Sequence, residues 1–386
     1  MNLPVSKLSS EQITIFTEMS ALATKHNAIN LGQGFPDYDP PFDLLDLVKK
    51  HLFDHKNQYA PMPGVLQLRE VLSKKIFDDY LCYVNPATEI TITAGATQAI
   101  FTAISAFIHA NDEVIIVEPA YDSYRPAIEI AGGKAVIYTM LSPDFCINWS
   151  MVQALITDKT RMIIINTPHN PTGTTLKNKD LNMLTELVRD TDIIILSDEV
   201  YEHLIYDGAP HQSVMRYPEL YSRSLAVFSF GKTFHATGWK LGYVAAPEYL
   251  MKEFRKVHQW NVFCVNSFIQ YALTDYLTEK THYEYLPEFY QKKRDYFNSI
   301  LSKTSFIPLK SEGTFFQLAD YSGISNLDDI LFTREMATNH GIAAIPLSVF
   351  YSTQEDLKLI RFCFAKTEKL LDAAGSKLES IDKIPG

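Results

Sequence analysis

Short apolar runs alternate with segments of helical periodicity along most of this chain. The runs show no regular polar alternation, which is typical of strands covered on both faces of a sheet. The pattern predicts strands at residues 89–93, 113–117, 135–138, 161–166, 193–196 and 225–228. It predicts helices at residues 66–80, 123–131 and 179–189, and from the loop 94–97 to residue 108. We therefore expect an α/β fold with a mostly parallel sheet covered by helices on both faces.

The two ends of the chain carry a second, smaller set of elements. Strands are predicted at 314–318, 342–346 and 359–364, with helices at 328–340 and 368–378. A long helical region from Glu248 onward should link two lobes, because 386 residues exceed the size at which a single core stops growing. A helical pattern over 13–31 ends in a short extended piece. We expect an N-terminal arm and part of the small domain at 1–44, a large cofactor-binding domain at 45–279 and a small domain at 280–386.

Composition narrows the classes of partner. The hydrophobic share of 46% and charged share of 21% are ordinary for a globular protein, and the net charge of −10 argues against nucleic-acid or membrane-surface binding. The four cysteines lie far apart, without a C-x-x-C or H-E-x-x-H motif, so we predict no metal site and no disulfide framework. The start has no apolar signal-peptide core and no stretch approaches a membrane span, so a cytoplasmic location is expected.

The loop at 94–97 lies between a predicted strand and a predicted helix. Free N–H groups point outward at a helix start, so such a loop can cradle an anion. The loop is neither a G-x-G-x-x-G nor a Walker sequence, which argues against an NTPase or a nicotinamide oxidoreductase. Like the other polar motifs that follow predicted strands, it lies where ligands bind in parallel sheets, at the carboxyl ends of the strands.

Lys232 and Lys240 lie in a turn-rich segment, residues 229–243, directly after the predicted strand 225–228. A lysine at the end of a core strand, with a second cation nearby, should find its ammonium form disfavoured. That environment turns a lysine into an imine-forming nucleophile. The alternative is a loop with two solvated lysines.

Seven motifs together resemble one family. They are the segments 30–37, A-G-A-T at 94–97, E-P-A-Y-D-S-Y at 118–124, N-T-P-H-N-P-T-G at 166–173, S-D-E-V-Y at 197–201, the segment 229–243, and I-R-F-C-F-A-K at 360–366. In this order they resemble the class I pyridoxal-phosphate aminotransferases of fold type I, over nearly the whole chain. The sequence looks closest to the methionine aminotransferases and kynurenine–glutamine transaminases. His169, and the run 343–350, differ from the kynurenine-type pattern and look like the bacterial methionine-type branch.

The resemblance implies pyridoxal 5'-phosphate as cofactor. Its ring stabilises a carbanion only while its nitrogen stays protonated, which requires a buried carboxylate, and Asp198 resembles that partner. Asn170 and Tyr201 are expected to donate to the phenolic oxygen, and Tyr121 to stack on the ring. The phosphate is expected on the amides of Gly95, Ala96 and Thr97, with Ser229 and Lys240 as further donors. Lys232 is expected to hold the cofactor and then to act as general base.

The resemblance also implies where substrate binds. Arg361, in an apolar strand, is expected to clamp the α-carboxylate together with Gly34 and Asn170, although a buried structural ion pair is the alternative. Phe16, Tyr59, Tyr121 and Phe263 are expected to line the side-chain pocket, which suits a thioether or an aromatic group. Tyr59 is expected to reach the phosphate from a second subunit, which implies a homodimer with shared sites. No motif places a second arginine, so an aspartate specialist is disfavoured.

The sequence thus predicts an aminotransferase that moves the α-amino group of methionine, or of another apolar or aromatic amino acid, to a 2-oxo acid. A kynurenine–oxoglutarate transaminase or a cysteine-S-conjugate β-lyase on the same scaffold is the alternative, because details of the pocket decide between such reactions. A binding protein that keeps the scaffold without turnover is a further alternative.

Overall fold

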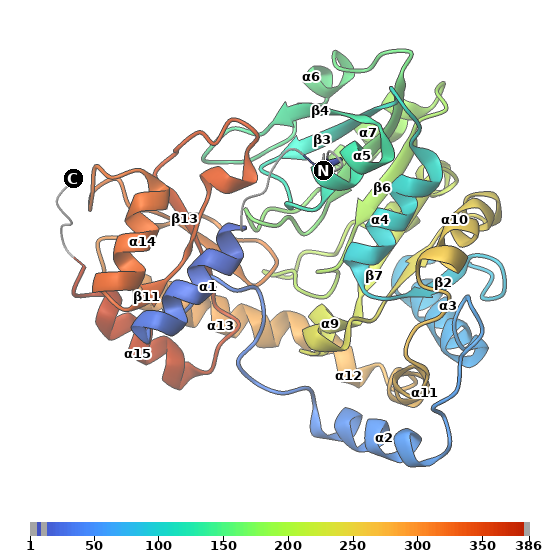
Figure 1. Ribbon diagram of the computed structural model, residues 1–386, viewed down its shortest axis with the longest axis horizontal. Coiled ribbons are helices and arrows are strands. Elements are labelled where there is room, and N and C mark those ends of the chain that lie inside the picture. Colours follow the sequence, from blue (N-terminus) through green and yellow to red (C-terminus); the bar gives the residue numbers. More distant parts are fainter. Residues whose placement is uncertain (1–5, 9–13, 382–386) are drawn as a thin grey trace, which may run out of the picture.

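A seven-stranded sheet forms the centre of the protein in the computed structural model, which describes residues 6–8 and 14–381 (Figure 1). Its strands are β2 Ile90–Thr93, β3 Glu113–Glu118, β4 Lys134–Thr139, β5 Thr160–Asn166, β6 Ile194–Asp198, β7 Ser224–Ser229 and β8 Gly242–Ala245. They lie in the order β2-β8-β7-β6-β5-β3-β4. The strands from β4 to β7 pair in parallel, as predicted.

The strand β8 was not predicted. It lies between β2 and β7 and runs antiparallel to both, so the sheet is mostly rather than wholly parallel. Its first residue, Gly242, approaches the neighbouring strand so closely that an added Cβ would overlap the Phe228 carbonyl oxygen. Glycine at this position therefore allows β8 to pair with β7.

Alternate residues of each central strand enter two hydrophobic cores. In β5, for example, Ile163 and Ile165 join one core while Met162 and Ile164 join the other. The first core is covered by α3 Leu66–Tyr80, α7 Asn178–Val188 and α11 Ser267–Tyr276, and the second by α4 Ala96–Phe107, α5 Tyr124–Ala131 and α10 Glu248–Asn261. Burial on both faces explains why these strands read as apolar runs.

A second, four-stranded sheet lies in the C-terminal part of the chain. It consists of β9 Ile307–Pro308, β10 Phe316–Asp320, β12 Ile345–Pro346 and β13 Leu359–Cys363, in the antiparallel order β12-β13-β10-β9. The prediction of a single strand over 342–346 was wrong. The chain bends at Ala344, so that β11 Ile342–Ala343 pairs with β1 Ile29–Asn30 and only β12 joins this sheet.

The start of the chain packs on its end. α1 Ile15–His26 lies beside α14 Asp329–Asn339, where Glu18 accepts hydrogen bonds from Arg334, and β1 pairs in parallel with β11 (Figure 1). α13 Leu286–Leu301 and α15 Glu368–Leu378 complete this part of the fold. The expected arm at 1–44 and small domain at 280–386 include residues 1–5, 9–13 and 382–386, which lie outside the described residues.

The remaining helices are short or lie at the edge of the molecule. They are α2 Phe42–Phe53, α6 Trp149–Gln153, α8 Pro218–Tyr221, α9 Phe230–Thr233 and α12 Thr281–Glu284, with 3₁₀ turns at Val214–Arg216, Thr237–Trp239 and Ser348–Phe350. α2 was not predicted; it packs on α11, where His51 Nε2 lies 2.8 Å from Asp275 Oδ2 (Figure 1). Across residues 6–8 and 14–381, every helix is too short or too polar to cross a lipid bilayer.

Candidate active site

A cavity of about 170 Å³ lies at the carboxyl ends of β5, β6 and β7. Most of the residues predicted to bind a cofactor line it, namely Gly95, Ala96, Thr97, Tyr121, Asn170, Asp198, Tyr201, Ser229, Lys232 and Lys240. The loops that carry them come from the strand ends of a parallel sheet, where ligands bind in this architecture. The structure therefore brings together motifs that are up to about 145 residues apart, since Gly95 and Lys240 line the same space.

Asp198 ends β6 and is buried at one side of this cavity. Its Oδ2 accepts a hydrogen bond from the Tyr124 hydroxyl at 2.6 Å, and its backbone carbonyl accepts one from Asn166 Nδ2 at 2.8 Å. Burial raises the pKa of Asp198 to about 6, against the opposing effect of the Tyr124 hydrogen bond. The carboxyl group is thus mostly ionised at neutral pH and can accept a hydrogen bond from a protonated ring nitrogen.

Tyr124 and Asn166 were missed as functional residues. Both belong to motifs that the sequence singled out, E-P-A-Y-D-S-Y and N-T-P-H-N-P-T-G, so the signal was present. Only the fold shows that these two side chains bond Asp198 from different elements, Tyr124 from the start of α5 and Asn166 from the end of β5.

A glycine cradle forms the anion-binding side. Gly95 precedes α4 with φ +80°, a conformation that favours glycine. A Cβ at this position would lie 3.6 Å from Lys240 Nζ, so a larger residue would fill the space between the helix start and the ammonium. Thr97 adds a hydroxyl that lies 3.2 Å from the Tyr121 hydroxyl. Backbone N–H groups, a helix start and a cation thus face the same space, an arrangement that binds phosphate.

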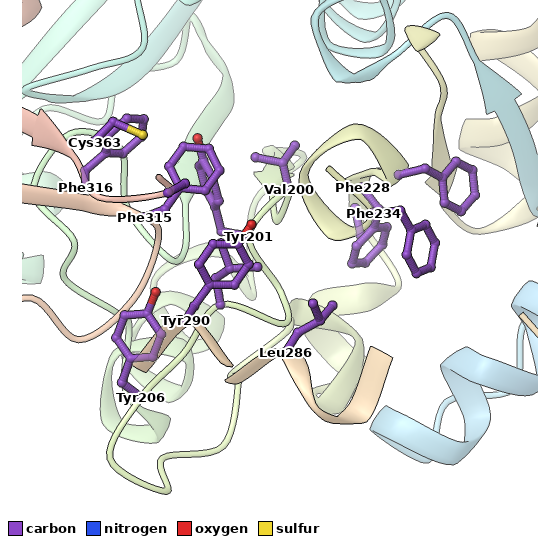
Figure 2. Close-up of a cluster of buried hydrophobic side chains, with 14 of the residues drawn as sticks. Val200, Tyr201, Tyr206, Phe228, Phe234, Leu286, Tyr290, Phe315, Phe316 and Cys363 are labelled. Carbon is purple, nitrogen blue, oxygen red and sulfur yellow. The ribbon is translucent and has the colours of Figure 1, made fainter. Parts of the chain in front are cut away.

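Lys232 lies in α9, directly after β7. Its Nζ donates a hydrogen bond to the Gly34 carbonyl at 3.0 Å and lies 5.6 Å from the centre of the Tyr201 ring. Tyr201 itself is held in a cluster of aromatic side chains, 5.1 Å from Phe315 (Figure 2). Burial lowers the pKa of Lys232 to about 8, and the charge of Arg361 also lowers it. The lowered pKa increases the uncharged fraction of the amine to about one tenth at pH 7, and a nucleophile must be uncharged.

Arg361 is buried in β13, with 2% of its surface exposed. It donates to Asn170 Oδ1 at 2.7 Å and to the Gly32 carbonyl at 3.1 Å, and its guanidinium lies 3.8 Å from the Phe316 ring centre. Among the described residues no carboxylate forms a salt bridge with it, and its Nε has no hydrogen-bond partner. The structural ion pair considered above is therefore absent from the described part of the chain, and an anionic ligand would supply the missing partner.

Gly34 belongs to the loop whose Gly32 carbonyl binds this guanidinium, and both Gly34 and the guanidinium contact the Phe316 ring. The amides of Gly32 and Gln33 donate to Asn30, and the amide of Phe35 donates to the Gln33 carbonyl. The Gly34 amide has no acceptor within the described ranges. A Cβ on Gly34 would lie 2.9 Å from Phe316 Cζ, so a larger residue would crowd this ring. The loop thus leaves one N–H group without an acceptor, two residues after the Gly32 carbonyl that Arg361 binds.

The four residues predicted to line a side-chain pocket do not all lie together. Phe16 and Tyr121 line a hollow of about 520 Å³ next to the cavity, and Phe16 lies 5.5 Å from the Arg361 guanidinium. Tyr59 is 82% exposed and packs edge-on against Phe263 at 5.3 Å, away from the cavity lining. Within one chain, Tyr59 and Phe263 therefore contribute to neither space.

Comparisons with known proteins agree with this geometry. The family described as aminotransferase class I and II matches residues 26–378. The chain is 46% identical to the methionine aminotransferase of Escherichia coli over 380 residues, which cover 98% of each protein. It is 32% identical to human kynurenine–oxoglutarate transaminase 1 over 414 aligned residues, covering 97% of each. The crystal structure of YbdL from Escherichia coli, described as having a methionine aminotransferase function, matches with a TM-score of 0.96 at 46% identity, covering 98% of this chain and 100% of that one.

Proposed function

Since the chain belongs to the class I and II aminotransferase family, we propose that it transfers the α-amino group of methionine, or of another apolar or aromatic amino acid, to a 2-oxo acid. The 46% identity to a methionine aminotransferase over 98% of both proteins supports this donor. The observation that carries the proposal is a pair of basic residues without a carboxylate salt bridge among the described residues: Lys232, which lines the cavity, and the buried Arg361, which bonds the cavity residue Asn170.

We propose pyridoxal 5'-phosphate as the cofactor. The Gly95 cradle beside Lys240 and the start of α4 suit its phosphate, with Ser229 as a further donor. Asp198, Asn170 and Tyr201 also line the cavity, which supports a role for Asp198 at the ring nitrogen and for Asn170 and Tyr201 at the phenolic oxygen. Pyridoxal 5'-phosphate, when bound, supplies an electron sink for the charge that develops at the substrate Cα.

Lys232 performs the proton transfer. Its Nζ would hold the cofactor, and its free amine would take the proton from the substrate Cα. A positioned general base of this kind contributes about 10²–10⁴-fold to the rate. The lowered pKa of about 8 leaves the amine available for this step, which an arginine at the same position could not perform.

Arg361 orients the substrate. Its guanidinium binds the α-carboxylate in a forked, two-bond geometry, and the Gly34 amide donates a third hydrogen bond. Asn170 accepts from Arg361 at 2.7 Å and fixes the plane of the guanidinium. Phe16 and Tyr121 line the adjacent hollow together with charged side chains such as Asp122 and Arg334. The aromatic part of this lining suits a thioether or an aromatic side chain.

We also propose a homodimer with shared sites. Exposed aromatic side chains gather at Tyr59 and Phe263, with Trp260 87% exposed nearby in sequence. A second copy that covered this surface could bring Tyr59 to the phosphate of its partner's site. Static light scattering should give twice the chain mass of 43.9 kDa. The domain boundaries 1–44, 45–279 and 280–386, and a cytoplasmic location, are part of the same proposal.

Kynurenine–oxoglutarate transamination is the second candidate, which the 32% identity to the human enzyme supports. A β-lyase reaction on cysteine conjugates is possible on the same scaffold, because both reactions begin with removal of the Cα proton. The pocket beside Phe16 decides among them.

One experiment separates the candidates. The protein, supplied with pyridoxal 5'-phosphate, is incubated with methionine, kynurenine or a cysteine conjugate, each with and without a panel of 2-oxo acids, and the products are separated by chromatography. We expect the 2-oxo acid of methionine and a new amino acid in equal amounts. Preferential use of kynurenine would favour the second candidate. Pyruvate and ammonia from the conjugate, with no amino transfer from any donor, would overturn the proposal.

A further inference from the structure

The loop that carries Gly34 is hydrogen-bonded to residues 366–367, which follow β13. Lys366 Nζ donates a hydrogen bond to the Phe35 carbonyl at 2.8 Å. The Asp37 carboxylate accepts two more, from the Thr367 backbone N–H at 2.7 Å and from the Thr367 hydroxyl at 2.9 Å. Residues 35–37 and residues 366–367 are thus joined on both sides of Pro36.

The burial of Lys366 is unusual for a lysine. It is 3% exposed, and within the described ranges no carboxylate forms a salt bridge with its ammonium. Its charge is compensated by the Phe35 carbonyl and by the Phe35 ring, whose centre lies 5.0 Å from Nζ. A buried ammonium is costly unless polar or aromatic groups stabilise it. Both groups that stabilise Lys366 belong to Phe35, so its burial depends on the position of this one loop.

Lys366 is itself fixed from behind. Its backbone carbonyl accepts a hydrogen bond from Lys293 Nζ at 2.8 Å, so α13 supports the segment from which the side chain projects. Arg361 lies earlier on the same strand-and-turn segment, with the Cys363 amide bonded to the Leu31 carbonyl. The strand that carries Arg361 and the loop that carries Gly34 therefore form one connected unit.

We propose that Lys366 and Asp37 are positioning residues for the substrate α-carboxylate. This inference rests on the proposed function, in which Arg361 and the Gly34 amide bind that carboxylate. Neither Lys366 nor Asp37 contacts the substrate. Their hydrogen bonds hold residues 35–37 against residues 366–367, and so fix the position of Gly34 relative to Arg361. The substrate carboxylate can then bind the Gly34 amide and the Arg361 guanidinium together. A small displacement of such a donor weakens binding and orientation.

The Lys366→Met variant tests the larger contact. Methionine replaces the apolar stem of the lysine with one of similar length and removes the charged donor. We expect the KM values for the amino acid and for the 2-oxo acid each to rise about tenfold, since a hydrogen bond to a charged group is lost. The kcat value, the visible absorbance of the bound cofactor and the melting temperature should stay close to those of the wild-type holoenzyme. The ratio of the KM values for methionine and phenylalanine should not change, because the carboxylate and not the side chain is affected.

Two further variants complete the test. Lys369→Met removes an exposed lysine of α15 and should leave both KM values unchanged. Asp37→Ala removes the two bonds to Thr367 at an exposed position, where folding is little affected, and should raise both KM values about threefold. If Lys366→Met does not fold, Asp37→Ala decides alone.

The outcomes are distinct. KM values within twofold of wild type in a folded Lys366→Met or Asp37→Ala enzyme would overturn the inference, as would a loss confined to kcat. Wild-type protein that transfers no amino group from any amino acid would instead overturn the proposed function, and this inference with it.

Discussion

Two lysines of this protein, the buried Lys75 and the partly buried Lys232, have opposite environments. Lys75, in α3, forms ion pairs with Glu202 at 2.9 Å and with Asp79 at 3.0 Å. Burial alone would lower the pKa of Lys75, but the two carboxylates outweigh it, so that its pKa lies above the ordinary value. Among the described residues no carboxylate forms an ion pair with Lys232, and burial lowers its pKa to about 8, although the charge of the nearby Asp198 opposes this. Burial by itself therefore does not distinguish a structural lysine from a reactive one.

The two lysines differ in the groups that bind their amines. Asp79, Glu202 and His203 lie close enough to bind a metal ion, but the Lys75 ammonium is bonded to two of them, and Tyr80 donates to Glu202 as well. Among the described residues the Lys75 charge is thus paired by two carboxylates, although Asp79 Oδ2 and His203 Nε2 have no hydrogen-bond partner there. Lys232 and Arg361 are left with neutral acceptors, a carbonyl and an amide oxygen, so their charges are available to a ligand. An incomplete set of partners at a strand end indicates a functional site.

Replacing Lys232 should have the largest effect. In Lys232→Met the rate of amino transfer should fall by at least about 10²–10⁴-fold, the contribution of a general base, with a further loss because the cofactor is no longer held covalently. The measurement is single-turnover transfer from methionine to a 2-oxo acid. Activity within tenfold of wild type would make the two lysines equivalent and remove the comparison.

The same variant should be more stable without cofactor. Because the folded pKa of about 8 lies below the ordinary value of 10.5, the unfolded chain binds more protons between these pH values. The Lys232 contribution to stability therefore rises with pH in this window and is unfavourable below it. Denaturant unfolding of the cofactor-free proteins measures this effect. The free energy of unfolding of wild type should rise relative to that of Lys232→Met between pH 7 and pH 10.

Replacing Lys75 should affect stability and spare the chemistry. Lys75→Met leaves the buried Glu202 carboxylate without its cation and should lower the free energy of unfolding by about 3–5 kcal/mol. The turnover per folded molecule should be unchanged. Lys74→Met, at a neighbouring exposed lysine paired with Asp78, is the matched control, with an expected change of at most about 0.5 kcal/mol. Equal losses from the two variants would contradict this account of Lys75.

Arg361→Lys should weaken substrate binding. Lysine keeps the charge but lacks the planar fork, so kcat/KM should fall about 10–100-fold, mainly through KM. Steady-state kinetics with methionine measure the change, while the melting temperature serves as the control for folding. An unchanged KM would place the carboxylate elsewhere.

Tyr124→Phe should have the smallest effect. The variant removes the 2.6 Å hydrogen bond to Asp198, so the pKa of this carboxyl should rise above its value of about 6. The acidic limb of the pH profile of kcat/KM should then move to higher pH by roughly one unit, since such a bond contributes about 1.5 kcal/mol. A limb that stays in place, or moves to lower pH, would show that Asp198 does not set it.

The sequence predicted the elements whose information is local. The apolar runs of β3, β5 and β6 and the helix at Leu66–Tyr80 follow from periodicity, because burial on one or both faces leaves a direct pattern. The direction of β8 and the break at Ala344 did not follow, because pairing partners far along the chain decide both. α2 carries a helical pattern that was overlooked.

The site residues also divide into those that local sequence motifs identify and those that only long-range contacts reveal. Lys232, Asp198 and Arg361 stand in motifs that the resemblance identifies, and the structure places them around connected spaces. Tyr124 donates to Asp198 from 74 residues away, and Lys366 bonds Phe35 across 331 residues, so neither contact could be read from spacing. Tyr59 lies on the surface of the single chain. Its proposed role requires a second copy of the chain, so one chain alone does not display it.

Chemical trapping of the cofactor tests the central claim most directly. The yellow holoenzyme is reduced with borohydride, digested and analysed by mass spectrometry to locate the lysine that carries the pyridoxyl phosphate group. We expect the adduct on Lys232 alone, with Lys75 and Lys240 unmodified. An adduct on another lysine, or a protein that takes up no cofactor, would contradict the account.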